Sequence, residues 1–139
     1  MAYDSLGAGT QNITAASTSW SHTLPAGGSV VVVCVHQGGL ADQVSAVTVG
    51  GEACTKLSSV SNGGAIAVDL WGKATSLTGA QTIVVTASLS NASSNSLAFT
   101  GRAVASIFGT VATNTGAGAS IAVTVTAVSG DDLACITGD

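Results

Sequence analysis

The feature of this sequence that most constrains its fold is a valine run, SVVVVCVH, which extends from Ser29 to His36. Valine is β-branched and favours extended strands. A strand that is apolar on both faces is typical of the middle of a sheet with material packed on each side. The run is also far too short to cross a bilayer. It therefore predicts a central β-strand.

Alternating residues predict further strands on either side of this run. Within residues 18–24, the side chains of Trp20, His22 and Leu24 fall on one face, because successive residues of a strand point in opposite directions. No helical period of any length interrupts this pattern. Further strands are predicted at residues 65–73, 81–89, 97–108 (with a bulge at Gly101), 121–126 and from Asp131 onward, with a polar loop at residues 90–96.

A glycine pair gives the clearest local signal. Residues 44–49 and 52–57 flank Gly50 and Gly51, which supply the positive φ angles that a two-residue hairpin turn requires. In total the sequence predicts about eight strands at short spacing, with no helix to connect parallel neighbours. We therefore expect an all-β fold, an antiparallel jelly-roll-like β-sandwich.

The 139 residues are enough for one domain with one core. We expect residues 1–17, which are small and polar, to form an N-terminal arm or a loosely paired edge, and residues 18–139 to form the sandwich. The last predicted strand ends at Asp139, which leaves little room to close a sheet. We therefore expect that the sandwich is truncated at its C-terminus, or that an assembly partner covers its last edge.

Charge is scarce in this chain. Charged residues make up 7% of it, against roughly 25% in typical soluble domains. Three basic residues stand against seven acidic ones, too few to bind nucleic acid by releasing its counterions. Two interpretations remain: a Ser/Thr-rich secreted β domain, or a protein whose surface is covered by its neighbours in an assembly. The first residues lack the features of a signal peptide, so we expect synthesis in the cytoplasm.

The three cysteines, Cys34, Cys54 and Cys135, have no metal-like spacing. Buried free thiols are the favoured interpretation, since a free cysteine behaves as a small apolar residue. A disulfide between Cys34 and Cys54, or an intermolecular bond from the remaining thiol, is the alternative.

No catalytic motif is present, and the sequence predicts no catalytic residue, cofactor site or metal site. His22 and His36 are the two histidines, and each is expected to be structural because no nucleophile motif accompanies it. Asp131 and Asp132 form the only acidic doublet. Neighbouring strand residues point to opposite faces, so we interpret the doublet as a solvated strand start rather than a calcium site.

Trp71 is the candidate binding residue. Strand alternation places it with Asp69 and Lys73, away from the apolar stripe of Ile66, Val68 and Leu70. An exposed tryptophan between charges can stack on a sugar ring or anchor an interface. The alternative is that both faces of this sheet are covered and Trp71 belongs to the core.

Several motifs resemble those of a family of jelly-roll, concanavalin-like domains found in bacterial exported proteins and phage structural proteins. The matching segments lie between residues 18 and 135: WSHTLPAGG, VVVVCV, VSAVTVGG, VDLWGK, GAQTIVVT, FTG and SGDDL. The resemblance implies no catalytic residues. It implies a structural unit used in virion decoration, in tail fibres, or in adhesive and sugar-binding modules.

These observations together predict a non-enzymatic virion protein of a bacteriophage, most specifically a capsid decoration protein that stabilises the shell. Its partners would be the major capsid protein or other virion proteins. We expect it to form homo-oligomers and to bind neither nucleic acid nor a membrane. It would be made in the host cytoplasm and located in the virion. The alternative is a carbohydrate-binding or adhesin module of a tail fibre or extracellular protein, which would hold a glycan through Trp71.

Overall fold

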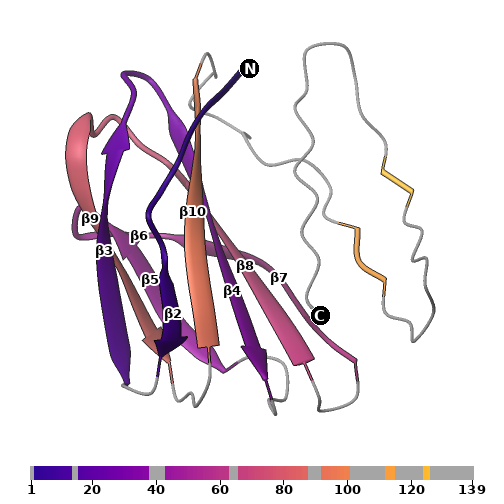
Figure 1. Cartoon of the computed structure of the whole chain (residues 1–139). Coiled ribbons are helices and arrows are strands. Elements are labelled where there is room, and N and C mark those ends of the chain that lie inside the picture. Colours follow the sequence, from indigo (N-terminus) through magenta and orange to yellow (C-terminus); the bar gives the residue numbers. More distant parts are fainter. Residues whose placement is uncertain are drawn as a thin grey trace.

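A computed structural model of the chain describes residues 2–13, 16–37, 43–62, 66–87, 92–100, 112–114 and 124–125. These ranges contain ten β-strands and no helix, and Figure 1 shows the strands as two facing layers. The strands are β1 (Ala2–Leu6), β2 (Thr10–Ile13), β3 (Ser17–Leu24), β4 (Ser29–Gln37), β5 (Val44–Val49), β6 (Glu52–Ala53), β7 (Thr55–Ser61), β8 (Ile66–Ala74), β9 (Gly79–Ala87) and β10 (Ala92–Thr100).

Two antiparallel sheets form the layers. One has six strands in the order β1-β10-β4-β8-β7, with β2 also paired to β10, and the other has four in the order β3-β9-β5-β6. Buried side chains from both sheets form one core cluster. The expected all-β, antiparallel sandwich is therefore confirmed. The strand count exceeds eight because short strands form within the first seventeen residues and at residues 52–53.

The valine run forms β4, and it is a central strand as predicted. It pairs along its length with β10 on one side, from His36 opposite Ala92 to Ser29 opposite Phe99. On the other side it pairs with β8 over all nine residues. Such continuous pairing satisfies the backbone hydrogen-bonding groups along both edges of the strand.

The predicted hairpin is correct at its turn and wrong in its second arm. Gly50 and Gly51 adopt φ angles of 56° and 84°, and β6 pairs with β5 for two residues. The chain then leaves this sheet at Cys54, whose amide donates to the Val47 carbonyl at 2.9 Å. The next strand, β7, pairs with β8 in the other sheet, where a longer partner is available. Residues 52–57 are therefore two strands in two sheets.

The polar loop predicted at residues 90–96 is also wrong from Ala92 onward. Those residues begin β10, which pairs with β4 on one side and with β1 and β2 on the other. Pairing on both sides outweighs the low strand preference of a Ser/Asn-rich segment. The side chains of Ser94 and Ser96 consequently lie in the interior, 4% and 0% exposed.

The N-terminal residues form a paired edge rather than a free arm. β1 runs antiparallel to β10, from Ala2 opposite Thr100 to Leu6 opposite Leu97, with an irregularity between Tyr3 and Ser5. β2 continues along the same strand. The predictions for residues 101–111, for most of the 121–126 strand, and for the segment from Asp131 with Cys135 lie outside the described residues.

The apolar centre of the core lies on the inner face of β5 and β9, which are neighbouring strands of the four-stranded sheet. The side chains of Val47, Val49, Ile83 and Val85 are all at most 1% exposed. They alternate along their strands with outward residues, as the sequence pattern of β9 predicts. Burying each such side chain contributes about 1.5–3 kcal/mol to folding.

Candidate functional site

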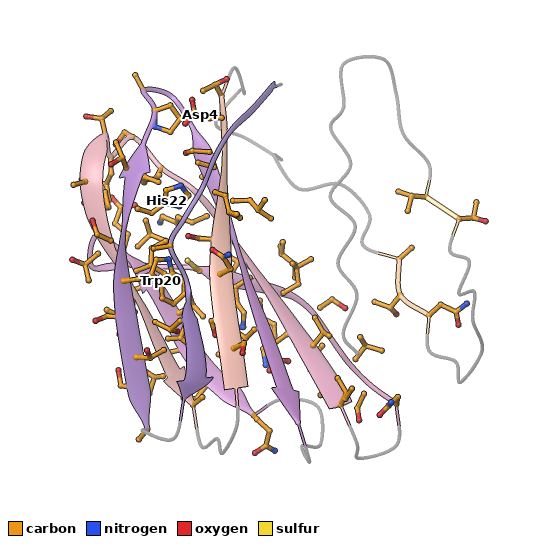
Figure 2. The ribbon with its side chains drawn as sticks, viewed as in Figure 1. Asp4, Trp20 and His22 are labelled. Carbon is orange, nitrogen blue, oxygen red and sulfur yellow. The ribbon has the colours of Figure 1, made fainter. Side chains whose placement is uncertain are left out.

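A cluster of buried polar side chains lies beside this apolar centre, where β1, β3 and β10 meet. His22 on β3 is 4% exposed, Trp20 on the same strand is 7% exposed, and Ser96 on β10 is completely buried. Figure 2 shows Asp4, His22 and Trp20 following one another in the space between β3 and β10. Buried polar groups require hydrogen-bond partners, and these residues supply them to one another.

The contacts form a continuous chain of hydrogen bonds. Trp20 Nε1 donates to Ser96 Oγ at 2.9 Å, and the same Oγ lies 2.8 Å from His22 Nδ1. On the other side of the imidazole, Nε2 lies 3.0 Å from Ser5 Oγ. Ser5 Oγ in turn donates to the Asp4 carboxylate at 2.8 Å. These hydrogen bonds thus join five residues, from a buried indole at one end to an exposed carboxylate at the other.

Local sequence explains half of this arrangement. Strand alternation directs Trp20 and His22 inward, while Ser19 and Ser21 face solvent. Ser96 comes from a strand more than seventy residues further along, so the pairing depends on the fold as a whole.

Gly7 allows the N-terminal segment to pass directly over this cluster. A Cβ atom at this position would lie 2.2 Å from Ser96 Oγ and 3.0 Å from His22 Nδ1. The Gly7 amide also donates to the Ser96 carbonyl at 2.7 Å. Any larger residue would push the segment away from the imidazole, so glycine is required here for close approach.

Electrostatics favour a neutral imidazole. Burial lowers the pKa of His22 below its usual value of 6.5, and this effect outweighs the opposing influence of the Asp4 charge, which raises the pKa. Both ring nitrogens have hydrogen-bond partners. His22 is therefore a hydrogen-bonded structural histidine, as expected from the sequence.

The structure places Trp71 in the core and not on the surface. Its side chain is 7% exposed, and Lys56 Nζ lies 5.0 Å from the ring centroid. The inward face of β8 carries Trp71 and Asp69, whereas the apolar stripe of Ile66, Val68 and Leu70 is only half-buried. Trp71 therefore belongs to the core, which was the alternative to an exposed binding residue, because its face of β8 is the one that packs against the other sheet.

The two charged neighbours of Trp71 make internal contacts. Asp69 is fully buried, and its Oδ2 accepts a hydrogen bond from the Val44 amide at 3.2 Å. Lys73 forms an ion pair with Glu52 at 3.1 Å. Trp71, Asp69 and Lys73 therefore connect strands of the sandwich and do not converge on an open binding surface.

Cys34 and Cys54 are both free thiols. Burial raises the pKa of Cys34 to about 12 and that of Cys54 to about 11. Since the thiolate is the reactive form, both side chains are chemically quiet at neutral pH.

Sequence reasoning missed the cluster around His22 as a unit. The alternation in β3 identified Trp20 and His22 as neighbours, but Ser96 was assigned to a loop and Ser5 to an arm.

Within the described ranges, no group of three or more His, Cys, Asp or Glu residues could hold a metal ion. No helix in that part of the chain is long and apolar enough to cross a membrane.

No protein-family model, curated protein or solved structure matches this chain. Its function is therefore inferred from its own residues and geometry.

Proposed function

We propose that this protein is a non-catalytic structural component of a phage virion, most specifically a capsid decoration protein that binds the assembled shell and stabilises it. It would act by covering the surface of neighbouring subunits, with many copies adding their individually weak contacts. Jelly-roll ancestry, homo-oligomerisation and synthesis in the host cytoplasm belong to the same proposal.

The observation that carries this proposal is that few charged side chains of the described residues face solvent. The described part of the chain has five charged side chains, and most of them are turned to internal contacts. Asp4 is exposed, Glu52, Lys56 and Lys73 are half-buried, and Asp69 is buried. A free soluble domain normally keeps more charge on its surface than this. Over the part of the chain that the structure describes, a surface with so few charges turned to solvent suits a protein that is covered by its neighbours.

The outer face of the four-stranded sheet supports the same conclusion. Exposed hydroxyl side chains follow one another along β3 (Ser19, Ser21, Thr23) and continue on β9 (Thr82, Thr86). Ser21 pairs with Thr82 in register, so hydroxyls from the two strands lie side by side at this point of the sheet. Contact with a partner would bury small neutral groups, which avoids the high cost of removing charges from water.

The geometry around Ser5 argues against a hydrolase. Ser5 Oγ lies next to an imidazole, but it donates its proton to Asp4 rather than to His22. An activated serine needs the histidine to accept that proton. The alternative of glycan binding through Trp71 also lacks support, because the ring is buried and Lys56 lies over it.

The direct test is to add the purified protein to undecorated shells of its phage and follow co-sedimentation and shell melting. We expect saturable binding and a higher melting temperature of the shell, since a ligand that binds only the assembled form stabilises it. Shells that neither bind the protein nor melt at a higher temperature would rule out the decoration role.

A charge-insertion pair locates the contact. Ser21→Glu with Thr82→Glu places two carboxylates on the outer hydroxyl face, and we expect it to weaken shell binding without unfolding the protein. The matched control, Ser21→Thr with Thr82→Ser, keeps both hydroxyls and should bind as the wild type does. Equal binding by both variants would exclude this face as the contact.

A further inference from the structure

The hydrogen bonds around His22 have one consistent direction. The Trp20 indole can only donate, so Ser96 Oγ accepts from it and its own proton is free to point at His22 Nδ1. At the other end the Asp4 carboxylate can only accept, and Ser5 donates to it. Ser5 Oγ must then accept from His22 Nε2. The imidazole is therefore neutral, with its proton on Nε2.

A second proton on this imidazole is incompatible with the hydrogen bond that Ser96 donates to it. It would sit on Nδ1 and point at the hydroxyl proton of Ser96, 2.8 Å away. Ser96 would have to turn its proton elsewhere while accepting from Trp20 and His22 at once. The charge would also lie in a site that is 4% exposed, where a buried cation is costly.

The segment that depends on this contact is β1. Of its described side chains, Asp4 is exposed and Leu6 is 58% exposed, so neither adds apolar burial of any size. Ser5 is the described side chain of β1 that reaches His22. The remaining described attachments of this segment are backbone pairs with β10, including the bond from the Gly7 amide to the Ser96 carbonyl.

We propose that the chain Trp20–Ser96–His22–Ser5–Asp4 is an acid-sensitive latch: it holds β1 on the sandwich while the imidazole is neutral, and it opens when His22 gains a second proton. The Nε2 bond to Ser5 survives that protonation; release is favoured because the charged ring reaches water only when the segment of β1 and Gly7 that covers it lifts away. This regulation goes beyond the proposed virion role and does not depend on it.

The charges that surround the imidazole set the pH range. β1 contributes Asp4, which favours the protonated form, whereas the residues that β3 and β10 place against the ring, Trp20 and Ser96, are uncharged. On β9, the residue opposite His22 in register is Gln81, also uncharged. Burial outweighs Asp4, so the folded pKa lies below 6.5. The latch is therefore fully engaged above pH 6.5 and is lost as pH falls through the folded pKa.

The first test follows His22 in the otherwise unchanged protein. Nitrogen NMR of the imidazoles, with a His36→Gln variant to assign the two rings, reports the tautomer directly. We expect His22 to carry its proton on Nε2 at neutral pH and to titrate below 6.5. A proton on Nδ1, or a titration at or above 6.5, would overturn the proposal.

The second test measures amide hydrogen exchange across that titration. We expect the protection of residues 4–7 to fall by about tenfold for each pH unit that separates the latched and released pKa values, while Val85 in the core keeps its protection. In His22→Gln the protection of β1 should not depend on pH. Protection that stays constant as wild-type His22 titrates, or that falls equally in the variant, contradicts the latch; if the variant does not fold, the wild-type titration alone decides.

Discussion

The interior of this sandwich is built in two different ways on its two sides. On the inner face of β5 and β9 the packed side chains are valine and isoleucine, and residues such as Val49 and Ile83 are completely buried. Where β3 and β10 face β1, the interior instead contains His22 and Ser96, which a chain of hydrogen bonds connects to the surface. Apolar packing, which does not depend on the orientation of the groups, stabilises the first side. Hydrogen bonds, which require a donor and an acceptor in the correct geometry, stabilise the second.

This difference predicts different responses to change. Apolar packing loses stability in proportion to the volume removed, and it is indifferent to pH. A buried polar chain responds instead to the chemical identity of each member, because removing one leaves its partners with their desolvation cost and without their hydrogen bond.

The largest effect is expected in the apolar side. Ile83→Ala removes a completely buried side chain and should lower the free energy of unfolding by about 2–5 kcal/mol in urea titrations. Val84→Ala on the same strand is the control, because its side chain is half-buried and points outward. Its cost should stay within roughly 1 kcal/mol. Similar costs for the two variants would mean that the core does not lie on the inner face of β5 and β9.

A smaller effect is expected in the polar side, with a sharper control. Ser96→Ala leaves the Trp20 donor and His22 Nδ1 without their partner, and should cost about 1–3 kcal/mol. Ser94→Ala changes the same residue type on the same inward face. Ser94 Oγ makes no hydrogen bond of standard geometry, and its polar contact is with the Cys34 thiol, a weak hydrogen-bonding group. This variant should therefore be nearly neutral. Equal costs at the two positions would contradict the hydrogen-bonded chain.

The smallest effect is expected at the ion pair of Lys73 with Glu52. The two side chains are 25% and 39% exposed, and water and salt screen such pairs. Lys73→Met, which keeps the aliphatic stem, should cost less than about 1 kcal/mol. The cost should shrink further in high salt when unfolding is followed by circular dichroism. A large cost that salt does not change would show that Lys73 contributes by packing.

Local pattern was enough to predict elements whose neighbours are close in the sequence. The inward face of β3 with Trp20 and His22, the glycine turn at Gly50 and Gly51, and the central position of β4 all follow from alternation, φ preference and apolar content. Each of these signals lies within a few residues of chain.

The sequence predictions were wrong where pairing with strands that are distant in the sequence determines the structure. Residues 92–96 look like a loop until β4 and β1 pair with them, and residues 55–57 leave the hairpin because β8 offers a longer partner. For Trp71 the sequence left both an exposed and a core position open, because Asp69 and Lys73 share its face, and the structure shows that this face is the inner one. The chain of hydrogen bonds at His22 joins three such distant segments, so no local pattern could have shown it.

The passage of the backbone from β6 to β7 has a mechanical consequence. Cys54 alone separates the two strands, so peptide bonds join the sheets at the edge where β6 and β7 lie. At the other edge, β3 and β1 are the outermost strands of their sheets, and the bond between His22 and Ser5 spans them. The two layers are therefore tied at both edges, by Cys54 at one and, at the other, by this bond together with the three residues that join β2 to β3, so force that separates the layers meets a short covalent link on either side.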